Sequence, residues 1–379
     1  MNNKGIIVLG GHVQALGITR ILGALRYPIV IVDQTRYNLA RHSKYCSSFH
    51  QVENEKILET LIKWINEKRF KNYVLLPTND FHVELLSKNK DQLKSHYVVG
   101  TDDWKSVSIF YNKISTYKLA DEVGIPIAKT LYPKSEDDLS QIDIEFPCII
   151  KPAVMHSFHA QTKRKVFVCE DENSLKENYK LAQNYIPKEE IIVQEIIQGP
   201  SKNQHSAAFL FLNGKPYVHL VACRMRQHPL DFGNATTYAE TVTLPLLKEF
   251  GEKLLIAANY NGICEVEFKL DERDNQFKFL EVNTRTWKWH TIANKAKTPF
   301  LEQYVDFLYG NEIQPLNTYE KASFFHLITD YPMRLKLLLK RQNYWNRKIK
   351  NSESAVFAKD DIKPWIMEKI YLPYLMAKR

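Results

Sequence analysis

The sequence lacks long hydrophobic runs, which bears on where the protein acts. No apolar run approaches the ~20 residues that a membrane-spanning helix needs. The first residues, MNNKGIIVLGG, have neither the basic start nor the long apolar core and small-residue cleavage site of a signal peptide. The protein is therefore expected to be cytoplasmic.

Cysteine is scarce and scattered. None of the five cysteines belongs to a C-x-x-C pair, which argues against a disulfide framework and against a zinc site. Internal repeats and low-complexity tracts are absent as well, so a disordered or fibrous protein is not expected.

What the sequence does contain is enough apolar material for a large core. The chain has 379 residues, of which 44% are hydrophobic. At ~150 residues per domain, two or three domains are expected.

The charge is positive and partly local. The net charge of +9 favours an anionic partner such as a nucleotide, phosphate, nucleic acid or membrane surface, without choosing among them. Residues 331–350 contain seven Lys or Arg and no acid. This run is either a solvated helical face or a surface for an anionic substrate or lipid head groups.

Residues 1–110 read as one α/β domain. Residues 4–33 have the pattern of strand, glycine-containing turn, helix and strand, and apolar runs keep alternating with helical periods after them. This rhythm predicts a parallel sheet covered by helices.

The first turn of this domain is rich in glycine. Gly10, Gly11 and Gly17 precede Asp33, but their spacing is not G-x-G-x-x-G, so dinucleotide binding is only one option. The other is a small-substrate role shared with residues 78–80, because open parallel sheets bind ligands beyond the carboxyl ends of their strands.

From residue 111 the pattern changes to an α+β unit that extends to about residue 305. A helix ends at Gly124 with a proline beyond it, and shorter strands and another helix follow. Two long strand pairs come next, one turning at Asn213–Gly214, a strong hairpin signal, and one at DERDN. The segment from about residue 311 reads as helices.

The second hairpin, residues 262–283, carries acids on both arms. Glu265 and Glu267 share one face by the two-residue period of a strand. Glu281 and Asn283 share a face of the returning strand. If the two arms pair through the turn DERDN, Glu267 lies across from the end of that strand that carries Glu281. Oxygen ligands without imidazole or thiolate suit Mg²⁺, which commonly also holds phosphates.

Two lysines offer charge for such phosphates. Lys151 follows an apolar strand, where a buried ammonium is costly unless it meets an anion. Lys113 begins a helix, where the helix dipole disfavours a cation. Taken singly, each is also compatible with a surface lysine.

At this point the chain resembles the ATP-grasp superfamily over roughly residues 1–305. The resemblance rests on motifs in the right order. They are NK (112–113), IIKP (149–152), VQEIIQG (193–199), EVE (265–267) and LEVNTR (280–285). Residues 222–241, the run TKRKVFV and the basic tail look like the carboxylate-amine ligase group that includes D-aspartate ligase.

The resemblance implies an α/β plus α+β fold. A parallel-sheet pre-ATP-grasp domain (1–110) would precede a two-part ATP-grasp clamp and a helical C-terminal tail. The clamp would comprise subdomain A (111–199) and subdomain B with a metal site (200–310), and the tail would be a basic extension (311–379).

The resemblance also implies site residues. Lys113 and Lys151 would bind ATP phosphates, and Arg285 would face the transferred phosphate or the acyl phosphate. The residues that would contact adenine are Gln194, Glu195, Ile197 and Leu280. The residues that would bind Mg²⁺ are Glu267, Glu281 and Asn283, and Mn²⁺ could substitute for Mg²⁺.

Two features are left to the residues themselves. Arg224 and Arg226 alternate onto one strand face, and Arg226 is expected to bind the acyl substrate, a surface ion pair being the alternative. Loop 153–166 has no glycine, so its amides cannot approach phosphate as closely as in many members of the superfamily. Lys163, Arg164 and Lys165 could supply charge instead, a solvated loop being the alternative.

The expected activity is ATP-dependent joining of a carboxylate to an amine through an acyl phosphate, and the alternative is a nucleotide-binding regulatory protein. Expected partners are ATP, a small carboxylate such as an amino acid, and an amine acceptor, with a large or lipid-linked anionic acceptor as one option. Nucleic acid and integral membrane insertion are not expected. Peripheral contact with the inner membrane face and a homodimer are further options.

Overall fold

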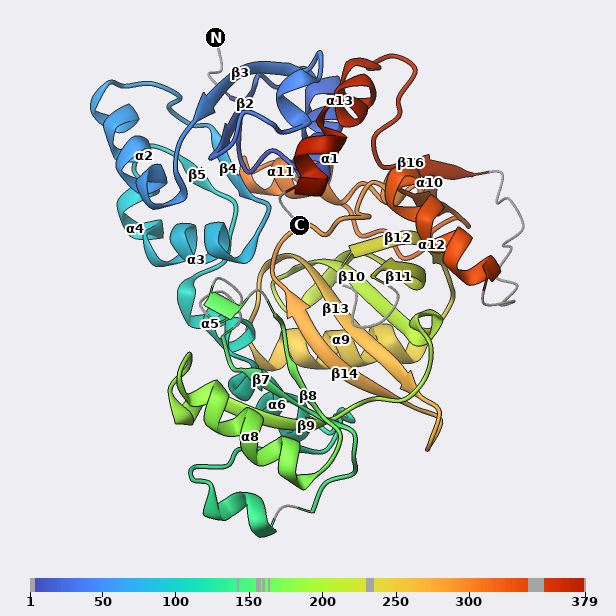
Figure 1. Ribbon diagram of the computed structural model, residues 1–379. Coiled ribbons are helices and arrows are strands. Elements are labelled where there is room, and N and C mark those ends of the chain that lie inside the picture. The colour runs from blue at the N-terminus through green and yellow to red at the C-terminus, as the bar shows by residue number, and fades with distance from the viewer. Residues whose placement is uncertain are drawn as a thin grey trace.

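Figure 1 shows the computed structural model of the chain. It describes residues 4–141, 143–154, 158, 161–162, 164–229, 235–339 and 351–377. The described strands form three sheets. The seven-stranded sheet, called the third sheet below, lies between the N-terminal five-stranded sheet and the four-stranded second sheet.

The first sheet has the order β3-β2-β1-β4-β5, and all its pairs are parallel. β1, β2 and β4 are buried on both faces because their apolar residues run without alternation. The predicted parallel sheet is thus confirmed. Its strands are β1 (Ile6–Leu9), β2 (Ile29–Asp33), β3 (Cys46–Gln51), β4 (Val74–Pro77) and β5 (Val98–Val99).

Helices cover both faces of this sheet. One face packs on α1 (Val13–Ala24), and the other on α2 (Ile57–Asn66), α3 (Asp80–Lys88) and α4 (Lys90–Leu93). The short 3₁₀ turns η1 (Ala40–His42) and η2 (Asn54–Lys56) lie in the connections.

The turn after β1 requires glycine. Gly10 has φ +105°, and a Cβ there would lie 2.1 Å from Thr78 Oγ1. The Thr78 hydroxyl donates a hydrogen bond to the Leu9 carbonyl oxygen at 2.7 Å. The glycine-rich turn after β1 and residues 78–80 after β4 therefore meet where the strand order reverses. This is the usual ligand position in open α/β sheets.

The second sheet is antiparallel, with the order β6-β9-β7-β8. α5 (Trp104–Tyr111) and α6 (Lys113–Glu122) lead into it, and α8 (Glu172–Gln183) packs on it with the turns η3 (Asp137–Gln141) and η4 (Lys188–Glu190) nearby. Its strands are β6 (Thr130–Leu131), β7 (Cys148–Pro152), β8 (Phe167–Cys169) and β9 (Ile191–Glu195).

The third sheet has the order β14-β13-β10-β11-β12-β15-β16. β10 and β11 turn at Asn213 and Gly214, which have φ of 52° and 76°, so the predicted hairpin is confirmed. One face packs on α9 (Pro245–Ala257) and the other on α1 and α11 (Phe300–Leu308). Its longer strands are β10 (Gln204–Leu212), β11 (Lys215–His228), β12 (Ala235–Thr241), β13 (Gly262–Asp271) and β14 (Gln276–Asn283); η5 (Ser201–Asn203) precedes them.

The segment after residue 311 contains strands as well as the predicted helices. β15 (Ser323–Phe325) pairs with β12, and β16 (Ser352–Ser354) pairs with β15. Three residues are too few to show a two-residue period, so these strands could not be predicted from the sequence. The helices after β14 are α10 (Ile292–Ala296), α11, α12 (Leu327–Leu339) and α13 (Lys363–Ala377).

The C-terminal segment is anchored to the N-terminal domain. Asp361 accepts hydrogen bonds from Arg20 Nε at 2.9 Å and from Ser43 Oγ at 2.7 Å. α13 consequently lies beside α1 (Figure 1). In the part of the chain that the structure describes, no helix combines the length and the hydropathy needed to cross a bilayer.

Candidate functional site

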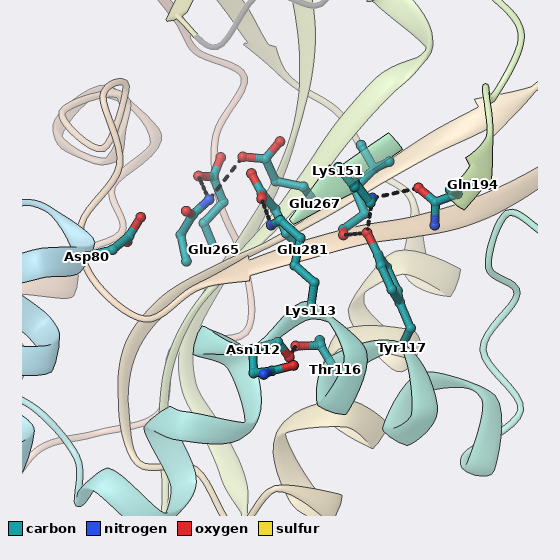
Figure 2. A network of polar contacts seen from close by, with 12 residues as sticks. Asp80, Asn112, Lys113, Thr116, Tyr117, Lys151, Gln194, Glu265, Glu267 and Glu281 are labelled. Carbon is teal, nitrogen blue, oxygen red and sulfur yellow. Dashed lines mark hydrogen bonds and ion pairs between the residues drawn. The ribbon is translucent and has the colours of Figure 1, made fainter. Parts of the chain in front are cut away.

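The candidate site lies between the second and third sheets (Figure 2). α6 and β7 contribute lysines, and the β13–β14 hairpin contributes acids. Lys113 takes its place because Asn112 caps α6: its Oδ1 accepts hydrogen bonds from the backbone N–H groups of Ile114 and Ser115 at 2.9 and 3.2 Å.

The acids of the hairpin converge as its two-residue period predicts. Glu267 pairs directly with Glu281, and Glu265 pairs with Asn283. The Asn283 amide donates to Glu265 Oε2 at 3.1 Å and to Glu267 Oε1 at 3.0 Å. The predicted juxtaposition of Glu267 and Glu281 is therefore confirmed.

Each of these two facing glutamates is paired with a cation. Lys113 Nζ lies 2.7 Å from Glu281 Oε2, and Arg224 lies 3.0 Å from Glu267 Oε2. Gln204 also donates to Glu267. Lys113, opposed by burial, lowers the pKa of Glu281 strongly, so this carboxyl stays ionised at neutral pH.

Lys151 is buried and donates hydrogen bonds to two neutral side chains. Its Nζ donates to the Tyr117 hydroxyl and to Gln194 Oε1, each at 2.6 Å. Tyr117 in turn donates to the Leu280 carbonyl at 2.9 Å, which fixes the hydroxyl (Figure 2). Burial lowers the pKa of Lys151, which expresses the cost of a cation there.

Arg285 joins the acid hairpin to the first sheet. Its Nε lies 2.6 Å from Asp80 Oδ1, and its NH2 group donates to Asn283 Oδ1 at 3.0 Å. Residues 78–80 and Arg285 are thus neighbours, although about two hundred residues separate them in the sequence.

Glu265 is a buried carboxyl behind this cluster. Trp289 Nε1 donates to its Oε1 at 3.1 Å. Burial, and then the nearby Glu267 carboxylate, raise the pKa of Glu265 to about 8.

This raised pKa predicts a pH-dependent stability. The folded chain holds the Glu265 proton above the ordinary pKa of 4.5, so the free energy of unfolding falls as pH rises from 4.5 towards about 8. The Glu265→Gln variant has no such proton. Its unfolding free energy relative to the wild type should therefore increase over that window, in urea titrations without divalent cations. A constant difference between the two proteins would contradict the prediction.

The residues expected around adenine lie at the end of β9 and beside it. The side-chain oxygen of Gln194 accepts a hydrogen bond from Lys151, and its amide nitrogen donates one to Thr130 Oγ1 at 2.7 Å. The Ile197 carbonyl accepts from Lys269 at 2.7 Å, and the Glu195 side chain contacts Arg273 at 3.1 Å. Leu280 is half-buried on β14.

Only part of the glycine-free loop 153–166 is described. Lys163 lies outside the described residues, and Arg164 is exposed and lies over Phe167. Burial lowers the pKa of Lys165, while the Glu281 and Glu267 carboxylates oppose that shift. Lys165 is therefore close enough to the acid hairpin to add positive charge there.

Arg226 is buried away from the acid hairpin. Its Nε and NH2 groups bond the two carboxylate oxygens of Asp330 on α12, at 2.7 and 2.9 Å. Thr237 Oγ1 donates to the same carboxylate at 2.9 Å. The pairing of β11 with β12 shifts register between Cys223 and Arg226, so the predicted alternation of Arg224 and Arg226 is interrupted, and their partners differ.

The donor set fits a hard divalent cation in its chemistry. Glu267 and Glu281 present carboxylate oxygens, and a half-turn of the Asn283 amide would bring its oxygen to the same side. Within the described ranges, no group of three or more His, Cys, Asp or Glu is close enough to hold a metal. A metal here would therefore need the amide, substrate oxygens or water as further ligands.

The sequence reasoning missed Tyr117 and the role of Arg224. Tyr117 lies four residues after Lys113, on the same side of α6, and this spacing was the available signal. The pairing of Arg224 with Glu267 has no local signal, because the partner lies two strands away in the sheet.

The chain resembles known proteins in sequence and in fold. Residues 235–303 match the family model "Carbamoyl-phosphate synthase L chain, ATP binding domain". The D-aspartate ligase of Enterococcus faecium (strain Aus0004) is 28% identical over 313 residues, which span 74% of this chain and 70% of that protein.

Two solved structures share the fold. The biotin carboxylase domain of Hydrogenobacter thermophilus 2-oxoglutarate carboxylase, complexed with MgADP, ADP and bicarbonate, has a TM-score of 0.65 at 14% identity, covering 84% of this chain and 73% of that one. The Staphylococcus aureus N5-carboxyaminoimidazole synthetase complexed with ADP has a TM-score of 0.62 at 15% identity, covering 83% and 79%. The chain therefore has the fold of these ATP-grasp proteins and is similar in sequence to a D-aspartate ligase.

Proposed function

We propose that the protein is an ATP-dependent ligase that joins a carboxylate to an amine. A small carboxylate, such as an amino acid, attacks the γ-phosphate of ATP. ADP departs, and the carboxylate becomes an acyl phosphate. The amine of an acceptor then displaces phosphate to form an amide or peptide bond. A cell-wall or surface-polysaccharide precursor is the acceptor class we favour, in keeping with the similarity to D-aspartate ligase.

One observation carries this proposal: Lys151 is a buried cation that donates hydrogen bonds to two neutral oxygens. Such an ammonium is unfavourable unless an anion joins it. Lys113 and Lys165 bring two more positive charges to the same acid hairpin. A nucleotide triphosphate supplies the negative charge that this arrangement favours.

The lysines have distinct tasks in this scheme. Tyr117 and Gln194 hold Lys151 in place, so its ammonium is oriented before phosphate arrives. These contacts favour a role for Gln194 in orienting Lys151 over a direct contact with adenine. The backbone of Glu195 and Ile197 and the Leu280 side chain are left to contact the base.

Glu267, Glu281 and Asn283 would hold the magnesium ion. When bound, Mg²⁺ neutralises phosphate charge and favours in-line transfer. The ionised state of Glu281 is prepared for this by Lys113, which keeps the carboxylate charged.

In this scheme Arg285 lies between the proposed carboxylate site and the proposed phosphate site. Asp80 and Asn283 fix its guanidinium next to the carboxyl ends of the first sheet. A carboxylate substrate that enters over Thr78 and Asp80 would meet the γ-phosphate beside this arginine. Positioning and electrostatics supply much of the rate, so no nucleophilic side chain is required.

The test is a coupled ADP-release assay with Mg·ATP and a panel of D- and L-amino acids, each with and without hydroxylamine. A hydroxamate formed from one amino acid would identify the activated carboxylate and establish the acyl phosphate. ATP binding without ADP release for any carboxylate, including larger acyl compounds, would instead support a regulatory nucleotide-binding protein.

The role of Arg226 in acyl binding can be tested against its partner. Arg226→Ala and Asp330→Ala break the same buried pair and should each lower the free energy of unfolding by about 3–5 kcal/mol. If Arg226 also contacts the acyl substrate, only Arg226→Ala should lower kcat/KM for that substrate by roughly tenfold or more. Equal kinetic losses in the two variants would make Arg226 a purely structural residue.

A further inference from the structure

We propose that the outward face of α12 docks onto an anionic lipid surface. This inference deepens the proposed function, on which it rests for its biological purpose: docking would bring the ligase site to a membrane-borne, negatively charged acceptor. The binding event itself is independent of catalysis.

α12 carries an apolar stripe that is open to solvent. Leu327, Tyr331, Leu335 and Leu338 are 52%, 65%, 47% and 51% exposed, and Leu339 is exposed as well. At ~100° per residue these five positions fall on one face about 120° wide. The other side of the helix buries Met333 and Leu337 against the protein. The helix therefore has two apolar sides, and only one is covered by the described chain.

Positive charge borders the exposed stripe. Arg334 and Lys336 are both exposed and lie on opposite flanks of it. The acid within α12 is Asp330, which is buried and bonded to Arg226. A helix with an apolar stripe between basic flanks is the arrangement that lies in the head-group region of anionic membranes.

A second copy of this chain is a poorer occupant. Pairing two such stripes would bring the basic residues of both helices together, since Arg334 and Lys336 would face their own copies. α12 offers no exposed acid to neutralise them. A lipid surface supplies both an apolar layer and negative charge, so charge complementarity favours it.

The inward side of α12 ties this face to the ligase site. Asp330 forms an ion pair with Arg226 on β11. Two residues along the same strand, Arg224 forms an ion pair with Glu267 of the acid hairpin. α12 packs beside β11 and β12 of the third sheet (Figure 1). Docking through α12 would thus orient the hairpin relative to the membrane through one continuous strand.

The experiment is co-sedimentation of the full chain with vesicles of phosphatidylcholine alone and with vesicles that also contain phosphatidylglycerol. Binding should be confined to the second set and should weaken as salt is raised. The double variant Tyr331→Ser/Leu335→Ser should weaken binding on the order of tenfold or more, because it removes two apolar side chains from the stripe. Lys336→Gln should weaken it by roughly fivefold, about 1 kcal/mol per basic residue.

Matched controls sit on other surfaces. Ile256→Ser removes a 56% exposed apolar residue from α9, and Lys105→Gln removes an exposed charge from α5; both should bind like the wild type. Circular dichroism and ADP release with soluble substrates should be unchanged in all four variants. Absence of binding to phosphatidylglycerol vesicles would overturn the docking proposal while an active protein leaves the ligase proposal standing. Loss of a dimer in the Tyr331→Ser/Leu335→Ser variant, seen by sedimentation without lipid, would also overturn it in favour of a second copy.

Discussion

Lys151→Met should abolish most ADP release, by roughly a hundredfold to a thousandfold, without unfolding the protein. Lys151 is 7% exposed, and burial lowers its pKa, so the wild-type chain tolerates an unfavourable cation at this position. Methionine fills similar space without charge. The free energy of unfolding in urea should therefore be unchanged or higher, because relief of the buried charge offsets the lost partner of Gln194.

The control for this variant is Lys118→Met on α6, where the lysine is exposed. It removes the same charge a few residues from Lys113 and should leave both activity and stability near wild type. An active Lys151→Met protein would mean that Lys151 does not meet phosphate. A strongly destabilised one would mean that its hydrogen bonds outweigh the cost of burying it.

Glu281→Gln should cause the second large loss, also about a hundredfold to a thousandfold in ADP release, with a raised requirement for Mg²⁺. The change keeps the shape of the side chain and removes one charge. The folded-state pKa of Glu281 lies below its ordinary 4.5, so its contribution to stability is present above pH 4.5 and is lost as pH falls below that value. The variant should be less stable than wild type at pH 7, and the difference should vanish in acid.

The size of that stability loss should be modest, on the order of 1 kcal/mol, because the Glu281 side chain is 42% exposed and water screens the pair. Lys113→Met/Glu281→Gln provides the double-mutant cycle. Removing both charges should restore stability, because neither is then left alone, while ADP release stays low. Recovery of activity in the double variant would show that the pair matters for folding and not for phosphate transfer.

The sequence located the acid hairpin well because its geometry is local. A strand period of two and a short turn at DERDN suffice to oppose Glu267 and Glu281. Lys151 could likewise be singled out, since a lysine after a run of buried apolar residues conflicts with its surroundings. Such conflicts are readable without coordinates.

Partners that are distant in the chain could not be predicted. Arg224 and Arg226 look equivalent in sequence, yet one pairs with Glu267 and the other with Asp330. The difference depends on which strand and which helix flank β11, and local pattern carries no information about that. Asp80 meets Arg285 for the same kind of reason, since the first sheet and the hairpin approach each other only in the folded chain.

The edge of the third sheet has a consequence for how the chain folds as it is made. β12 is synthesised well before β15, which supplies its hydrogen-bonding neighbour. Until residues 323–325 leave the ribosome, β12 presents an open edge to other nascent chains, and such edges promote aggregation. The N-terminal parallel sheet can form long before that point. Nascent chains halted between residues 241 and 323 are therefore the ones we expect to depend most on chaperones.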